Sequence, residues 1–167
     1  MRKLITGESK PLQQSRHASD WLDLEQLVQV EITSEDAEHP IESALIDNND
    51  SGWRADEPGE QTIRLVFDKP QKITRIQLLF EESEHQRTQE FVLRWSPDDG
   101  DSKHEIVRQQ YNFSPPANTR EMEDYTVNLD DVLILEMSIT PDISRGNTRA
   151  SLCLLYTSDA ADECVNV

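Results

Sequence analysis

Apolar residues recur at every second position along most of the chain. The clearest runs of this kind span residues 27–32, 63–67, 76–80 and 91–95, and further apolar clusters lie at 106–107, 125–127 and 133–139. A period of two is typical of strands with one face on a core. Turn-forming residues lie between the runs at 68–70, 97–101, 114–118 and 141–147. The pattern predicts at least seven strands in an all-β antiparallel sandwich of the jelly-roll type.

Length and charge narrow the class of protein. The 167 residues suffice for one domain with its own core, and the formal net charge is -17. This charge repels phosphate backbones and anionic lipid surfaces, so we expect neither nucleic acid nor membrane as a partner. No segment has the roughly 20 apolar residues that span a bilayer, and the N-terminal residues lack the apolar stretch of a secretory signal. We therefore expect a cytoplasmic protein. We also expect residues 1–24 to form an N-terminal arm that precedes the sandwich.

The last fifteen residues need an interpretation of their own. Residues 153–163 read Cys-Leu-Leu-Tyr-Thr-Ser-Asp-Ala-Ala-Asp-Glu and resemble a translated sequencing-adapter read-through. We interpret 153–167 as a non-native tail; the alternative is a natural last strand followed by an acidic tail. The sandwich then spans residues 25–152 and is truncated or altered at its last strand. Both cysteines, Cys153 and Cys164, fall in the tail, so the rest of the chain has no disulfide or thiolate metal site.

Several motifs, in the correct order, carry a resemblance to a known family. The longest are Ala-Leu-Ile-Asp-Asn-Asn-Asp-Ser-Gly-Trp at 44–53 and Phe-Val-Leu-Arg-Trp-Ser-Pro-Asp-Asp-Gly at 91–100, and shorter ones lie at 63–68, 72–78, 139–142 and 149–152. Together they resemble the discoidin, or coagulation factor 5/8 type C, superfamily. This superfamily is galactose-binding-like and includes the family 32 carbohydrate-binding modules. One departure is Ser51, where the family usually has Thr. The resemblance implies a galactose-binding-like β-sandwich.

The resemblance also implies a ligand site on loops at one end of the sandwich. In this chain those loops are 33–40, 54–60, 81–89 and 142–148. Their amide, imidazole, carboxylate and guanidinium groups can form the paired hydrogen bonds that sugar hydroxyls require. The alternative is that these loops are only solvated and charged. The candidate ligand-binding residues are Glu82, His85, Arg87, Gln89, Arg54, Arg145 and Asn147.

A calcium site is the one cofactor that the sequence suggests. Asp47, Asn49 and Asp50 offer carboxylate and amide oxygens on one short loop, and hard cations such as Ca²⁺ prefer oxygen ligands. The alternative is a solvated turn without a metal. The family commonly adds an acidic residue from the last strand, and in this chain the adapter-like tail stands at that place. The sequence therefore predicts at most a partial structural calcium site.

No catalytic motif accompanies these features. His17, His39, His85 and His104 lack metal-ligand spacing, and the sequence contains no nucleophile elbow or phosphate loop. We therefore expect no enzyme activity and a module that binds carbohydrate. The alternative partner is another protein, bound by an intracellular protein-protein interaction domain of the same fold. The proposed loops contain no aromatic platform, which weakens the carbohydrate interpretation, and the oligomeric state stays open.

Overall fold

The structure is a computed structural model that describes residues 2–6, 28–46 and 52–158. Its elements are β1 (Arg2–Ile5), β2 (Val28–Ile32), α2 (Glu42–Leu45), β3 (Trp53–Pro58), β4 (Gln61–Glu81), β5 (Arg87–Ser96), β6 (His104–Phe113), β7 (Arg120–Thr140), β8 (Arg149–Leu152) and β9 (Leu154–Ser158). Across these residues, one seven-stranded sheet has the order β1-β2-β4-β7-β5-β6 with β9 paired to β4, and β3 pairs with β8 in a second sheet. No helix in the described ranges is long and apolar enough to cross a membrane.

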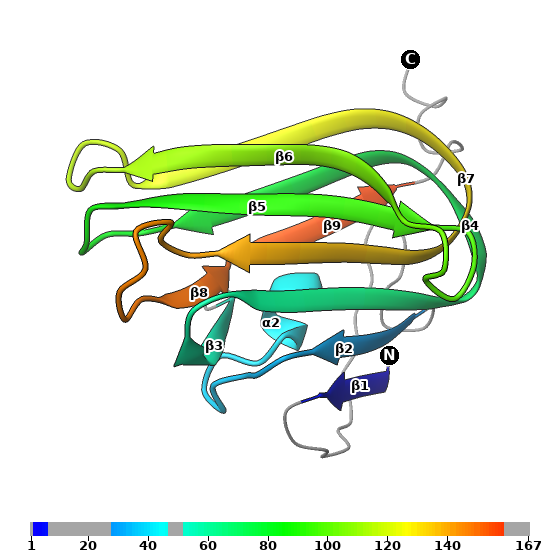
Figure 1. The fold of residues 1–167 in the computed structure, drawn as a ribbon, viewed down its shortest axis with the longest axis horizontal. Coiled ribbons are helices and arrows are strands. Elements are labelled where there is room, and N and C mark those ends of the chain that lie inside the picture. Colours follow the sequence, from blue (N-terminus) through cyan, green and yellow to red (C-terminus); the bar gives the residue numbers. More distant parts are fainter. Residues whose placement is uncertain (1, 7–27, 47–51, 159–167) are drawn as a thin grey trace.

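Two long bent strands fold the large sheet into a sandwich. The first half of β4 pairs with β2 and with residues 134–139 of β7, whereas its second half pairs with β9 and with residues 120–132 of β7. Figure 1 shows β4 and β7 curving together around one end of the molecule. Each strand therefore contributes to both layers. The predicted all-β sandwich is confirmed.

The turn predicted at residues 68–70 is wrong. The chain stays in β4 through these exposed residues, and the register with β7 shifts between Val66 and Gln71. A similar bend in β7 lies near Asp131, whose φ is 58°. Strands can change layer at such irregularities without losing their pairing. Turn-forming residues occur both at a bend within a strand and at a turn between strands. Because β4 and β7 each contain two of the seven apolar runs, these runs occupy only five strands.

The core lies between the layers and is built from the predicted alternating positions. Leu65, Ile76, Leu78 and Phe91 are each at most 1% exposed. Phe91 stacks on Phe80 with ring centroids 5.3 Å apart. These inward positions confirm the period of two.

Two tryptophans take different positions relative to this core. Trp53 is 1% exposed, and its indole nitrogen donates a hydrogen bond to the carbonyl of Ser34. Trp95 is half-buried at the edge of the core and lies beside His104, with ring centroids 5.0 Å apart. Neither indole face is presented as an open platform for a ligand ring.

The start of β3 requires a glycine. Gly52 has a φ of +66°, and a Cβ there would lie 2.6 Å from the carbonyl oxygen of Leu152. No other residue type fits that approach without displacing backbone. The close contact brings Trp53 opposite Leu152, so that β3 and β8 form the base of the loop end.

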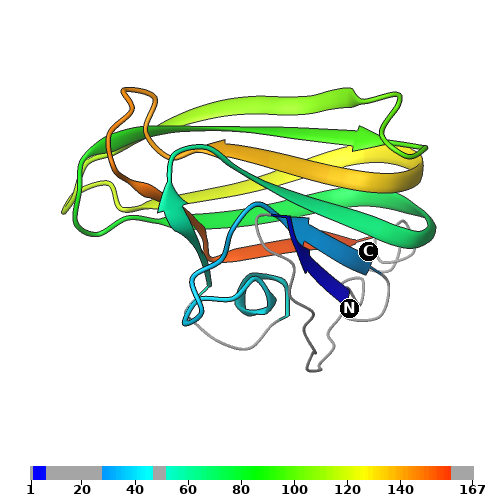
Figure 2. The ribbon, with the colours of Figure 1, turned by 60° about the horizontal axis from the view of Figure 1, so that its bottom comes forward.

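Both chain ends contribute strands to the large sheet. Within the expected N-terminal arm, β1 pairs in parallel with β2. The buried ammonium group of Lys3 lies 2.9 Å from Glu35 and 2.6 Å from Glu42, which ties β1 to the segment around α2. At the other end, β9 pairs with β4 and buries Leu155, and α2 contacts β9 (Figures 1 and 2). The segment interpreted as a non-native tail thus supplies a strand.

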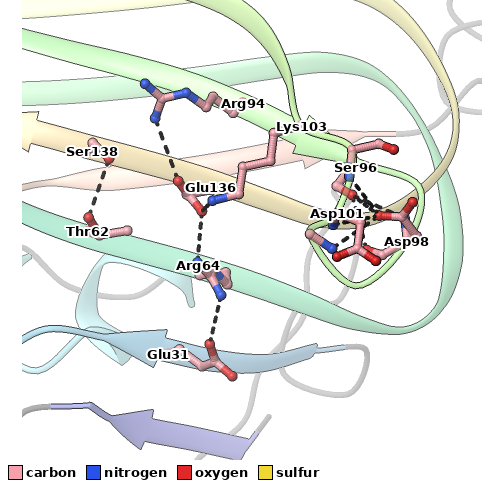
Figure 3. Close-up of polar contacts among 12 residues, drawn as sticks. Glu31, Thr62, Arg64, Arg94, Ser96, Asp98, Asp101, Lys103, Glu136 and Ser138 are labelled. Carbon is pink, nitrogen blue, oxygen red and sulfur yellow. Dashed lines mark hydrogen bonds and ion pairs between the residues drawn. The ribbon is translucent and has the colours of Figure 1, made fainter.

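A row of charges fixes the outer face of the large sheet. Glu136 of β7 is 5% exposed and lies 3.1 Å from both Arg64 of β4 and Lys103, and 3.6 Å from Arg94 of β5. Figure 3 shows these groups in a row across neighbouring strands, extended by Glu31 of β2. Because a buried carboxylate needs opposite charges, this cluster favours one register of the strands.

The turn predicted at 97–101 is formed around one carboxylate. Asp98 accepts hydrogen bonds from the Ser96 hydroxyl and from the backbone amides of Gly100, Asp101 and Ser102 (Figure 3). The Ser96 hydroxyl and these amides hold the pKa of Asp98 below its usual value. Internal hydrogen bonds therefore occupy this acidic group.

Candidate ligand-binding site

A cavity of about 730 Å³ opens at the end of the sandwich where β3 and β8 lie. One wall is the loop 81–85 between β4 and β5, and the opposite wall is the end of the loop between β7 and β8. The floor comes from β3 and β8. The lining includes four of the predicted site residues, Arg54, Glu82, His85 and Asn147, together with Glu84 and Thr148. The structure thus brings three of the four predicted loops together.

Glu82 gives the first wall its shape. One carboxylate oxygen accepts hydrogen bonds from the amides of Glu84 and His85, and the amide of Glu82 donates to the carbonyl of Thr119. Burial raises the pKa of Glu82, but the hydrogen bonds from Arg87 and from these amides outweigh burial and lower it. Glu82 is therefore charged at neutral pH and holds the loop closed.

Arg87 and Gln89 do not line the cavity. Arg87 is 5% exposed, and its guanidinium donates to Glu82 at 2.7 Å, to the carbonyl of Pro141 at 2.7 Å and to Gln89 at 3.2 Å. The same group lies 4.7 Å from the ring centroid of Phe113. Gln89 is 1% exposed. Both side chains support the cavity from inside the sandwich and cannot contact a ligand in it.

A buried acid completes this internal network. Gln89 donates to Glu121 of β7 at 3.3 Å, while the second oxygen of Glu121 is buried and has no hydrogen-bond partner among the described residues. Burial, together with neighbouring Glu123, raises the pKa of Glu121 to about 8. The same surroundings raise the pKa of Tyr125, whose hydroxyl donates to Gln109. This layer of the sandwich therefore contains buried polar side chains beside its apolar ones.

Exposed polar groups face the cavity itself. No described residue hydrogen-bonds to the side chains of Arg54 or Asn147. His85 is exposed, and its imidazole lies 3.8 Å from Glu84. Arg149 also lines the cavity and lies 3.7 Å from Asp36 of the loop 33–40. Arg54 and Asn147 therefore present donors and acceptors that no described residue uses, whereas Arg149 is paired with Asp36.

The sequence profile of the F5/8 type C domain matches residues 29–148, which is well over half of the chain. The chain belongs to the F5/8 type C domain family. Among curated proteins, none matches the sequence.

Solved structures share the fold of this F5/8 type C domain. A pectin-binding carbohydrate-binding module has a TM-score of 0.57 at 20% identity, covering 81% of this chain and 92% of that one. The family 32 module of C. perfringens NanJ, in complex with galactose, has 0.54 at 16%, covering 78% and 92%. Reduced XRCC1, bound to the catalytic domain of DNA polymerase β, has 0.55 at 12%, covering 77% and 93%. At these identities the likeness concerns the fold.

In this F5/8 type C domain, Arg145 lies apart from the candidate ligand-binding residues of the first cavity. Arg145 lines a second cavity of about 310 Å³, together with Gly59, Glu60 and Ile143 among others. Thr148 lines both cavities. The predicted site is therefore divided by the loop 142–148, with Asn147 on one side and Arg145 on the other.

The predicted calcium ligands Asp47, Asn49 and Asp50 lie outside the described residues. In the part of the chain that the structure does describe, no group of three or more His, Cys, Asp or Glu residues is arranged to hold a metal ion. Calcium binding stays a prediction that rests on those three residues.

Cys153 is a further lining residue that the sequence did not suggest. Burial raises the pKa of its thiol to about 11, with help from Glu81. The thiol is therefore protonated at neutral pH and a weak nucleophile.

Proposed function

We propose that this F5/8 type C domain is a non-catalytic carbohydrate-binding module whose ligand lies in the cavity of about 730 Å³. The family and the carbohydrate-binding modules of the same fold support a binding role. Binding sites on such scaffolds are made by loops, so the ligand has to be argued from the loop residues themselves.

The observation that carries the proposal is the chemistry of the lining. Arg54 offers planar donors, Asn147 offers a donor and an acceptor, and Thr119 offers a hydroxyl. No described residue hydrogen-bonds to any of these three side chains. The two apolar lining residues, Trp53 and Leu152, are at most 1% exposed. A ligand rich in hydroxyl groups matches this surface, and an apolar ligand does not.

A glycan array tests the proposal, read with and without Ca²⁺. We expect binding by the unmodified protein and a loss of about tenfold or more in affinity for Arg54→Ala, because one charge-assisted hydrogen bond is worth about 1.5–3 kcal/mol. Arg2→Ala is the matched control, since Arg2 is an exposed arginine paired with Asp68, which does not line the cavity.

Two results would count against this function. Failure to bind any sugar under either condition would overturn the carbohydrate assignment. Equal loss in Arg54→Ala and Arg2→Ala would remove the cavity as the site.

Protein binding is the second candidate function. It is favoured by the XRCC1 structure, which has a protein partner, and by the absence of an aromatic residue exposed in the cavity among the described residues. A protein ligand would bury an interface of about 1,200–2,000 Å² and extend beyond the cavity. Mutations of exposed residues outside the cavity lining would then weaken binding, whereas a sugar bound in the cavity would be insensitive to them.

A further inference from the structure

The second cavity lies directly beside the proposed site. Its volume is about 310 Å³, and it is bordered by Gly59 and Glu60 on one side and by the loop 142–148 on the other. Thr148 belongs to the lining of both cavities, and its carbonyl accepts a hydrogen bond from the amide of Gly59. A chain-like ligand that leaves the first cavity over Thr148 therefore enters the second.

This second cavity contains the apolar surface that the first one lacks. Ile143 is 46% exposed and lines it. The side chain is exposed on a well-anchored backbone, because the amide of Ile143 donates to the carbonyl of Thr88 at 2.9 Å. Pro141, two residues earlier, is held by Arg87 at 2.7 Å. An apolar side chain on such a fixed backbone can pack against the apolar C–H face of a sugar ring.

Arg145 lies next to this apolar surface in an unusual conformation. Its φ is 74°, a region that residues other than glycine rarely adopt. The turn is closed by Asp142, whose carbonyl accepts from the amide of Arg145 and whose carboxylate accepts from Ser144. No described residue pairs with the guanidinium of Arg145. Backbone strain of this kind is often kept where a side chain serves a ligand.

We infer that the ligand of this domain is an oligosaccharide of at least two sugar residues. One residue lies in the first cavity, and the next packs against Ile143 and hydrogen-bonds to Arg145 in the second. This inference rests on the carbohydrate-binding function proposed above. Ile143 and Arg145 are the two residues that select for the length of the ligand.

Calorimetry on each sugar that the glycan array identifies, as monosaccharide and as di- to tetrasaccharide, tests the inference. We expect the unmodified protein to bind the disaccharide about tenfold more tightly than the monosaccharide, because the second sugar covers the exposed part of Ile143 and accepts a hydrogen bond from Arg145. In Ile143→Ser and in Arg145→Ala this gain is lost, while affinity for the monosaccharide stays the same.

Met122→Ser is the matched control, because Met122 is 50% exposed and lines neither cavity. It should keep the gain with chain length. Equal affinity of the unmodified protein for all lengths would overturn this inference and leave the proposed function standing. Absence of binding to every array sugar would overturn the proposed function, and this inference with it.

Discussion

At the scale of single residues, Arg87 connects the two loops that enclose the cavity. It bonds to Glu82 in one loop and to the carbonyl of Pro141 at the start of the other, from a position that is 5% exposed. Its planar guanidinium uses separate nitrogens for the two contacts and holds them in a fixed relative direction. The distance between the cavity walls therefore depends on a side chain that the ligand never contacts.

Arg87→Met tests this role. It removes the buried cation and leaves the Glu82 carboxylate and the Pro141 carbonyl without their partner, so we expect a loss of about 3–5 kcal/mol in the free energy of unfolding. The measurement is urea denaturation. Hydrogen exchange should also speed up at the amides of Glu84 and His85, which bond to Glu82.

The control is Arg2→Met, where an exposed ion pair with Asp68 is broken and about 0–1 kcal/mol is expected. Unchanged stability and unchanged exchange in Arg87→Met would refute the connecting role of Arg87.

The sequence contained a signal for this burial. Arg87 and Gln89 share the parity of Phe91 and Leu93, which are fully buried in the same strand. In an alternating strand, every second residue points to the same face. Arg87 and Gln89 therefore have to point inward unless β5 begins after them. The prediction treated residues 81–89 as one loop because they are polar. Charge and hydrogen-bonding capacity do not reveal where a strand begins.

At the scale of elements, the first half of β7 turns acidic side chains toward the interior. Glu121 and Glu123 share the parity of Tyr125 and Val127, which pack against the core. Glu121 is 1% exposed, and burial raises its pKa from the ordinary value of 4.5 to about 8. The folded protein therefore binds a proton here that the unfolded chain releases over this pH range.

This difference predicts a pH dependence of stability. The contribution of Glu121 is fully present below pH 4.5 and is lost as the pH rises toward 8, since the folded state holds the proton more tightly than the unfolded state. In Glu121→Gln this loss should be absent, and the variant should be the more stable protein above pH 8. Urea denaturation at a series of pH values measures both curves.

Glu105→Gln serves as a control, because the Glu105 side chain is 47% exposed on β6. Its pH profile should follow that of the unmodified protein. If Glu121→Gln also follows that profile, the carboxyl group is not held protonated by the fold.

At the scale of the whole molecule, the sequence was sufficient for the fold and indicated three of the loops that meet at one cavity. Alternation revealed the strands, and the ordered motifs revealed the family, which the profile match confirms. Alternation does not show whether a strand stops or bends, so β4 and β7 were each predicted as two strands. Alternation also does not show to which side of a loop each side chain points. Asn147 and Arg145 of one loop therefore line different cavities, which the sequence did not predict.

The most direct measurement for the carbohydrate-binding account is a backbone NMR titration with the sugar that the glycan array selects. If a sugar binds at the proposed site, chemical-shift changes will be concentrated in residues 81–85 and 142–151, which form the walls and part of the floor of the two cavities. Shifts centred instead on the edge strand β6, or no shifts at saturating sugar, would contradict it.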